Sequence, residues 1–397
     1  GSQPEEETVL QALAREFSER DGTAVKIEFF TWEEINSKYL AALAAGTPPN
    51  IGQHGPDLPL RFGQDGAVLP VDDLVGELGR ERFFPEFLDA VCRYQEHYWS
   101  VPWFIEVRSL LIRTDWLAEL NLEPPTTWDE WVRVCAAMTR DTDGDGAIDR
   151  WGFGMYGNDH FGQSWIPFAA QNGGGLFAAD GSITVAAPEN VAALAWYGDL
   201  YRKHRVTPPG TKSATWIDAN LYYKRGLVGS LITNAYLLKE LRADAPEVLA
   251  ASRFYPIPVP RAGVRSRSYL GGSHLMVFRD APHVDAARRF VRFLLDRNNY
   301  LRFLKSVEGG ALPVFRDVAS DPFFSDDPNL SVLIDQIAGA VRHPHRGPPN
   351  PAVGAAEGER IFGRALREVL AGTKSAEAAL RDAQQATAAL FARHGAA

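Results

Sequence analysis

"YWSVPWFIEVRSLLIRTDWLAELNLEPPTTWDEW", residues 98–131, joins an extended apolar run to a capped helix. Within it, the bulky apolar residues of "VPWFIEVRS" (101–109) predict a strand. Glu106 and Arg108 are two residues apart, so their side chains would share one face of that strand. Further on, "TTWDEWVRVCAAMTR" (126–140) begins with a threonine followed three residues later by an acid, which predicts a capped helix.

The sequence on both sides of this stretch alternates between helix and strand patterns. Residues 5–20 have apolar side chains at helical spacing, "AVKIEFF" (24–30) alternates like a strand, and residues 33–46 again predict a helix. Beyond residue 140 we expect a strand-like segment at 151–157, helices at 188–204, 216–243 and 282–298, extended crossings at 253–260 and 269–278, and two Ala-rich helices at 354–393. This order predicts an α/β fold with helices on the faces of its sheets.

Length and composition place the chain among ordinary globular proteins. Its 397 residues exceed what one hydrophobic core supports, so two lobes are expected. The net charge of −9 argues against a general nucleic-acid surface, which needs clustered positive charge. No apolar run reaches the roughly 18 residues that a membrane span needs. Cys92 and Cys135 lie in apolar helical patterns, which favours buried free thiols over a disulfide between them.

"DTDGDGAID" (141–149) has the aspartate spacing of a calcium-binding EF-hand loop. The twelfth position, where an EF-hand has a bidentate glutamate, is Gly152, so the full sensor motif fails. Two interpretations remain, a structural calcium site and a solvated Asp-Gly turn. In the first, the ligands would be the four carboxylates and one carbonyl of Asp141, Asp143, Asp145, Asp149 and Ala147.

Several stretches together resemble the extracellular solute-binding proteins of ABC importers, in the large maltose-binding-protein-like family that binds sugars. Residues 98–131 resemble that family's hinge crossing and its next helix. The other matching stretches are "YLAALAAGTPPNI" (39–51), "FGQDGAVLPVDDL" (62–74), the crossing that runs from "GGSHLMVF" to "GGALPVF" (271–315), and "REVLAGTKSAEAALRDAQ" (367–384). The likeness covers nearly the whole chain in the right order.

The resemblance implies a type II periplasmic-binding-protein fold, in which two α/β lobes joined by crossing strands hold a ligand in the cleft between them. We expect one lobe from residues 1–110 and 265–315 and the other from 111–264 and 316–397. It also implies an extracytoplasmic location, ABC permease subunits as partners, a monomer, and no required cofactor apart from the calcium considered above. Family members usually begin with a short apolar strand, whereas this chain reaches its first helix within a few residues.

A sugar site needs aromatic surface and side chains that both donate and accept hydrogen bonds. The residues of this kind near the proposed crossings are His54, Asp57, Trp103, Glu106, Arg108, Trp165, Trp216, Asp218, Asn234, Tyr236, Gly272 and Ser273. His54, Asn234 and Tyr236 are included because the family uses these places for ligand contacts.

Each of these candidates also has a structural interpretation. Glu106 and Arg108 could form an ion pair, His54 could satisfy a loop carbonyl, and Asp57 could cap a helix. Trp165, with Phe161, could be core, and Gly272 could be a plain turn with positive φ. The sequence leaves these alternatives open.

The leading functional hypothesis is an importer's binding component that captures a di- or oligosaccharide by hinge closure. A site for glycerol phosphate esters would need more converging positive charge than Arg108, Arg265 and Arg267 provide. A glycosidase with paired carboxylates is the enzymatic alternative. We favour a protein without catalytic activity, because no nucleophile or zinc-protease motif appears.

Overall fold

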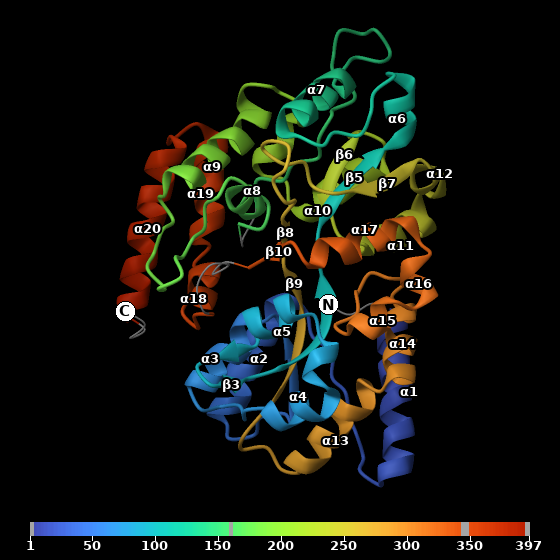
Figure 1. Ribbon diagram of the computed structural model, residues 1–397, viewed down its shortest axis with the longest axis vertical. Helices are drawn as coiled ribbons and strands as arrows, with labels where there is room; N and C mark the ends of the chain where they lie inside the picture. Colours follow the sequence, from blue (N-terminus) through green and yellow to red (C-terminus); the bar gives the residue numbers. More distant parts are fainter. Residues whose placement is uncertain (1–3, 159–161, 343–348, 394–397) are drawn as a thin grey trace. The chain divides into compact units, whose positions relative to one another are not determined.

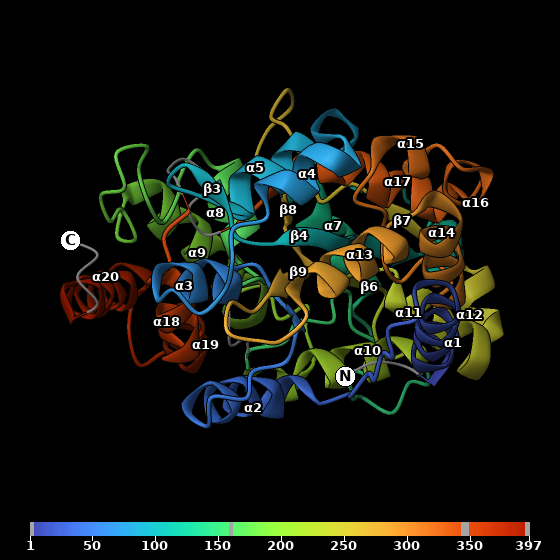
Figure 2. The ribbon, with the colours of Figure 1, turned by 90° about the horizontal axis from the view of Figure 1, so that it is seen from below.

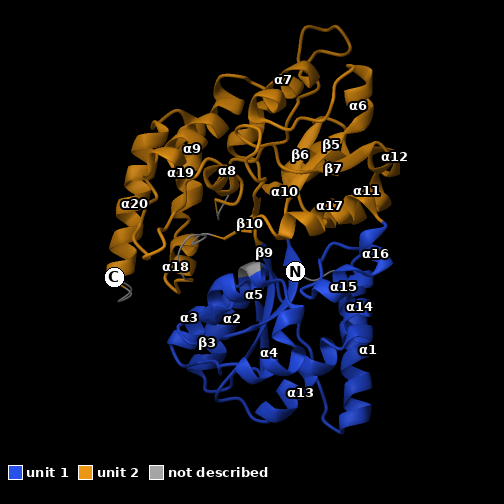
Figure 3. Cartoon of the chain, in the orientation of Figure 1, with its two compact units in different colours: residues 1–106, 271–326 blue, residues 107–270, 327–397 orange. Residues whose placement is uncertain are grey.

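A computed structural model describes residues 4–158, 162–342 and 349–393 of the chain. The chain folds into two compact units, each made of separate segments of sequence (Figure 3). Unit 1 consists of residues 1–106 and 271–326, and unit 2 of residues 107–270 and 327–397. Within the described ranges, no helix is both long enough and apolar enough to cross a bilayer.

Unit 1 contains one central sheet with helices packed around it. Its helices are α1 (Pro4–Asp21), α2 (Trp32–Ala44), α3 (Asp57–Gln64), α4 (Asp72–Leu78), η1 (Arg80–Arg82), α5 (Pro85–Val91), α13 (Val284–Leu294), α14 (Arg297–Ser306), α15 (Arg316–Ala319) and α16 (Pro322–Ser325). Its strands are β1 (Ile51–His54), β2 (Arg93–Tyr94), β3 (His97–Tyr98), β4 (Val101–Glu106) and β9 (Gly271–Val277).

The sheet of unit 1 has the order β1-β9-β4, with both strand pairs antiparallel. The central strand β9 therefore pairs with two strands that lie about 170 to 220 residues earlier, since Gly52 faces Met276 and Ile105 faces Gly272. Helix α1 lies beside α14 in both views (Figures 1 and 2), where the guanidinium of Arg302 binds the carboxylate of Glu16 at 2.7 Å.

Unit 2 also has one main sheet, with a larger number of helices. Its helices are α6 (Thr114–Glu119), α7 (Trp128–Met138), α8 (Ile166–Gln171), α9 (Pro188–Arg202), η2 (Pro209–Lys212), α10 (Trp216–Lys224), α11 (Tyr236–Asp244), α12 (Pro246–Ala250), α17 (Pro328–Ile337), α18 (Val353–Gly358), α19 (Ile361–Ala371) and α20 (Ala376–Arg393). Its strands are β5 (Ser109–Arg113), β6 (Ser230–Thr233), β7 (Ser252–Tyr255), β8 (Ser268–Tyr269) and β10 (Ala340–Val341).

The main sheet of unit 2 has the order β6-β5-β7 and is antiparallel throughout. Every residue of β6 is buried, as are all residues of β5 except Arg113. An aromatic cluster fills the adjoining core, where the rings of Trp128 and Trp196 stack with centroids 4.2 Å apart. Trp131 packs edge-on against Phe153 in the same cluster. Aromatic pairs of this kind contribute beyond their buried area.

Local sequence signals for helices are reproduced closely. Helix α7 begins after Thr127, whose hydroxyl accepts from the backbone N–H of Glu130, and the Glu130 carboxylate reaches back to the N–H of Thr127. Hydrogen bonds from Thr126 and Thr127 lower the pKa of Glu130 to about 2. Cys92 and Cys135 are free thiols in the two separate units, both buried, so the disulfide alternative is wrong.

Three predictions differ from the structure. Residues 24–30 form no strand, because no segment pairs with them, although their exposure alternates as the pattern requires. The expected helix 216–243 is interrupted by strand β6, whose Ser-Leu-Ile-Thr sequence pairs with β5 and is wholly buried. The segment 151–157, expected to be strand-like, has only an isolated bridge between Trp151 and Val228.

The chain changes units at 106/107 and 270/271, whereas the expected boundaries are 110/111 and 264/265. The third change falls at 326/327 instead of 315/316, because α15 and α16 are bound to unit 1. There the guanidinium of Arg82 binds the Asp317 carboxylate at 3.0 Å, and Lys305 binds Asp321 at 3.2 Å.

Gly272 gives the first testable prediction. Its φ is +130°, and a Cβ at this position would lie 2.2 Å from the carbonyl oxygen of Phe104 on the paired strand. Gly272→Ala should therefore lower the free energy of unfolding by about 3 kcal/mol or more, since backbone strain and overpacking each cost about 1–3 kcal/mol. Urea denaturation measures this loss.

Gly263→Ala is the matched control, because Gly263 also has a positive φ (+82°) but no atom within 4 Å of its would-be Cβ. We expect it to cost only the backbone strain. Equal losses for the two variants would show that the close approach of β4 to Gly272 contributes nothing.

Candidate functional site

At the end of strand β1 in unit 1, a histidine lies next to an exposed aromatic ring of helix α2. Trp32, the first residue of α2, is 47% exposed, and its indole lies edge-on to the His54 imidazole with centroids 5.4 Å apart. The Nδ1 of His54 lies 3.3 Å from the carbonyl oxygen of Gly55, so His54 does contact a loop carbonyl, as its structural interpretation expects. His54 thus remains a candidate, with Trp32 as its neighbour.

Trp32 was missed by the sequence reasoning. It stands at the start of a helix, directly after the capping residue Thr31, where the apolar pattern reads simply as the beginning of a core face. The sequence contained one signal for Trp32. A large aromatic residue stands there at the first position of a helix, between Thr31 and an acidic residue. About half of its surface is exposed, so its apolar ring is accessible from solvent.

Asp57 and Ser273 also belong to unit 1 and are engaged there. Asp57 is the first residue of α3; the N-cap is Pro56, so Asp57 adds negative charge to the helix's first turn without acting as the cap. The Ser273 hydroxyl is fully buried and accepts from the Nε2 of Gln53 at 3.1 Å. Gly272 has the positive φ of the structural interpretation, but within strand β9 rather than in a turn.

Trp103 does not present its ring to a ligand. It is the extra residue of a β-bulge, because Pro102 faces His274 while Phe104 faces Ser273. Its ring is 1% exposed and packs on Phe303 with centroids 4.3 Å apart. The ring of Trp103, which the sequence offered as a ligand contact, therefore lies in the core.

Trp165 is likewise core, in unit 2. Its side chain is fully buried and its indole N–H donates to the carbonyl of Phe362 at 3.3 Å. The core interpretation, which the sequence left open, is therefore the one that the structure favours. Phe161, grouped with it, lies outside the described residues.

Arg108 lies in the break between β4 and β5, so the argument that it shares a strand face with Glu106 does not apply. Its backbone is fixed by Ser268, whose Oγ accepts from the Arg108 N–H and donates to its carbonyl, both at 2.7 Å. The guanidinium carbon of Arg108 lies 5.2 Å from the ring centre of Tyr269. Glu106 ends β4 and belongs to unit 1.

Tyr269 is held by a second set of charged groups. Strand β8, which contains it, pairs in parallel with β10 (Figure 1), and Arg342 follows β10 directly. The guanidinium of Arg342 lies 5.1 Å from the Tyr269 ring centre and 3.4 Å from the Glu357 carboxylate. The Tyr269 hydroxyl donates to the same carboxylate at 3.1 Å. The ring that Arg108 contacts is therefore fixed at both its face and its hydroxyl.

Helix α10 presents the exposed aromatic ring of unit 2. Trp216 is its first residue and is 53% exposed. Asp218, two residues on, forms a capping box with Thr215: its carboxylate accepts from the Thr215 N–H at 2.8 Å and from the hydroxyl at 2.7 Å. These bonds lower the pKa of Asp218. The Asp218 carboxylate, which was predicted to bind ligand, therefore already accepts the hydrogen bonds that cap helix α10.

Asn234 and Tyr236 lie between strand β6 and helix α11. The Asn234 side-chain oxygen accepts from the Tyr236 N–H at 3.2 Å, and both side chains remain partly exposed. They lie directly beyond the carboxyl end of a buried strand, where ligand groups in α/β proteins gather. Their role in binding stays a prediction.

The aspartate loop follows α7 and is exposed. One carboxylate oxygen each from Asp141, Asp143 and Asp149 lie within 4.8 Å of one another. Oxygens around Ca²⁺ at 2.3–2.6 Å are separated by at most about 5 Å, so this spacing fits such an ion. Backbone N–H groups of Gly146 and Gly144 donate to Asp141 and lower its pKa.

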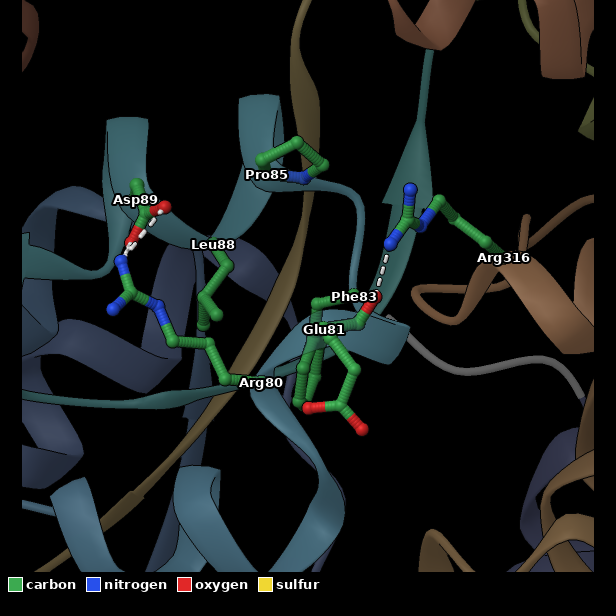
Figure 4. Close-up of a pocket in the computed structure, with 7 residues that line it drawn as sticks. All are labelled: Arg80, Glu81, Phe83, Pro85, Leu88, Asp89 and Arg316. Carbon is green, nitrogen blue, oxygen red and sulfur yellow. Dashed lines mark hydrogen bonds and ion pairs between the residues drawn. The ribbon is translucent and has the colours of Figure 1, made fainter.

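A cavity of about 330 Å³ in unit 1 contains none of the predicted site residues (Figure 4). Its two arginines are already engaged: Arg80 binds the Asp89 carboxylate at 3.1 Å, and Arg316 donates to the carbonyl of Glu81. Because both guanidinium groups already donate to acceptors in the cavity wall, we do not assign a ligand to it.

The chain belongs to the bacterial extracellular solute-binding protein family, whose model matches residues 1–299. Among curated proteins it is 24% identical over 385 residues to a maltotriose-binding protein of Pyrococcus abyssi, covering 94% of this chain and 77% of the relative. It is 26% identical over 292 residues to the diacetylchitobiose-binding protein DasA of Streptomyces coelicolor, covering 71% and 65%.

A solved structure that this chain resembles is the GacH receptor of Streptomyces glaucescens, crystallised without ligand and with acarbose. The TM-score is 0.83 at 21% identity, and the match covers 98% of this chain and 96% of that one. The fold is therefore the two-lobed α/β fold of periplasmic solute-binding proteins, as predicted. Both the family and the fold are those of binding proteins.

Proposed function

We propose that this protein is the substrate-binding component of an ABC importer and that it captures a di- or oligosaccharide. One observation carries the proposal: each unit exposes about half of one tryptophan at the start of a helix, Trp32 in unit 1 and Trp216 in unit 2. A sugar offers apolar C–H faces that pack on such rings. The relatives named for maltotriose and diacetylchitobiose support a carbohydrate.

Capture would proceed by hinge closure, with the ligand contacting both lobes at once. Inverting an open-to-closed ratio of 99:1 needs about 5.5 kcal/mol of differential binding. Hydrogen bonds to charged groups contribute about 1.5–3 kcal/mol each, so two or three of them with aromatic contacts are sufficient. The closed protein, located outside the cytoplasm, would dock as a monomer on the permease and release the sugar intact.

The tryptophans give the test of this proposal. Trp32→Ala and Trp216→Ala should each weaken oligosaccharide binding about tenfold or more, since stacking and burial of one ring contribute about 1.5–3 kcal/mol. Isothermal titration across a panel of di- to tetrasaccharides measures the affinity. Mass spectrometry of the recovered ligand should show it unchanged, because we propose no catalytic activity.

Matched controls exist on the same two helices. Leu40 on α2 and Ile217 on α10 are 56% and 58% exposed, so truncating them to alanine removes a similar apolar surface outside the proposed contacts. These variants should bind as the unaltered protein does. If all four substitutions had the same effect, or none had any, the rings would have no role in binding.

We further propose that the aspartate loop binds a structural calcium ion through Asp141, Asp143, Asp145, Asp149 and the Ala147 carbonyl. The supporting observation is the clustering of three carboxylates in one exposed loop, which repel one another without a cation. The ion would fasten the end of α7 to the segment after the loop, where Arg140 and Arg150 form a backbone bridge. It would take no part in sugar binding.

Removing calcium with a chelator should lower the melting temperature of the protein, and adding calcium back should restore it by mass action. Asp143→Asn should abolish most of this difference. Leu40→Ala, which lies in the other unit, should preserve it. A melting temperature that does not respond to calcium in the unaltered protein would leave the solvated turn as the correct interpretation.

A further inference from the structure

The guanidinium of Arg108 has no hydrogen-bond acceptor and no carboxylate partner in the part of the chain that the structure describes. Its Nη1 is buried and unsatisfied. Within the same described ranges, the guanidinium carbon lies 5.2 Å from the ring centre of Tyr269 in a cation–π interaction. This contact compensates the charge in part and leaves the donors of the fork unfilled.

An unfilled buried donor is costly, about 1–3 kcal/mol and more when the group is charged. The structure nevertheless fixes Arg108 in this state. Ser268 binds its backbone on both sides, and the ring of Tyr269 beneath it is held through Glu357. An arginine whose backbone is held and whose charged group rests on a fixed ring, with donors left open, is suited to an acceptor that comes from outside the chain.

We propose that Arg108 binds the carboxylate of an acidic sugar, so that the ligand is an oligosaccharide containing a uronic acid. This inference rests on the proposed function, which it narrows to one class of carbohydrate. A neutral hydroxyl would fill a hydrogen bond but leave the charge of Arg108 uncompensated. A carboxylate fills two donors of the planar fork and neutralises the charge at once.

A carboxylate also fits better than a phosphate. A phosphate monoester carries up to two negative charges and would require a second free cation beside Arg108. Arg342, on the same ring, is already paired with Glu357. Arg265 is exposed to solvent. One carboxylate neutralises the single charge of the Arg108 guanidinium, so no second arginine is needed.

The test uses a panel of uronate-containing di- to tetrasaccharides, each paired with the same compound after reduction of its carboxylate to a primary alcohol. The unaltered full chain should bind at least one acidic member at least about tenfold more tightly than its reduced partner, since a charge-assisted hydrogen bond contributes about 1.5–3 kcal/mol. This comparison requires no variant. A glycosyl phosphate completes the panel.

Arg108→Gln should bring the acidic and reduced members of a pair to nearly equal affinity, and Arg108→Lys, which keeps the charge but loses the fork, should give an intermediate ratio. Arg265→Gln is the matched control, because it removes one positive charge from the same unit and should leave the ratio unchanged. A purely structural role for Arg108 would alter the melting temperature but not the preference for the acid.

The outcomes separate this inference from the proposed function. Tight binding of a neutral or carboxyl-reduced oligosaccharide, with no preference for the acid, would overturn the acidic assignment and leave a sugar-binding protein. Preference for the glycosyl phosphate, lost in Arg108→Gln, would replace the carboxylate with a phosphate. If no saccharide of any kind bound, both proposals would fall.

Discussion

The structure depends on the pairing of strands that are distant in sequence. In unit 1 the central strand β9 takes its two neighbours from residues 51–54 and 101–106, and it has no neighbour from its own segment. Such contacts close long loops, whose entropic cost rises only slowly with loop length but must be met before the sheet stabilises the unit. The tight approach at Gly272 and the bulge at Trp103 are both local consequences of this pairing.

The chemistry of the protein is decided by which side chains this pairing buries. Most of its tryptophans fill cores: Trp103 enters the core of unit 1 through a bulge, and Trp131 and Trp165 lie in that of unit 2. Trp32 and Trp216 are left exposed, each at the first position of a helix. Among the described residues, the Arg108 guanidinium has no hydrogen-bond acceptor and lies against the ring of Tyr269. We propose that a carbohydrate binds these exposed rings and this guanidinium.

The structural features that were predicted correctly are those that depend on residues close together in the sequence. The capping box at Thr127 and Glu130 involves only adjacent turns, and helix α7 begins where that motif places it. Residues 24–30 show the limit of such signals: alternation predicts an extended chain, but a strand needs a partner, which no local pattern supplies. Strand β6 was hidden for the same reason, because its four buried residues read equally well as part of a helix.

The residue types of the candidate site could be predicted from the sequence. The role of each side chain could be predicted less well. Asp218 was recognised as a polar group beside Trp216, yet its carboxylate is used by the cap at Thr215. Trp103 was chosen as an aromatic residue near the proposed crossings, whereas its bulge and its burial depend on strand pairing that no local pattern shows. Trp32 was overlooked because exposure is a property of tertiary packing. Arg108 was selected as a polar side chain near the hinge crossing, whereas its contact with Tyr269 and its backbone bonds to Ser268 depend on tertiary structure.

The central claim is that two units close around a carbohydrate that contacts both. Small-angle X-ray scattering of the full chain, with and without a saccharide that titration shows to bind, tests this most directly. We predict a smaller radius of gyration in the presence of the saccharide, and no change with a sugar that does not bind. Identical scattering curves at saturating ligand would contradict the account, because binding would then occur without closure.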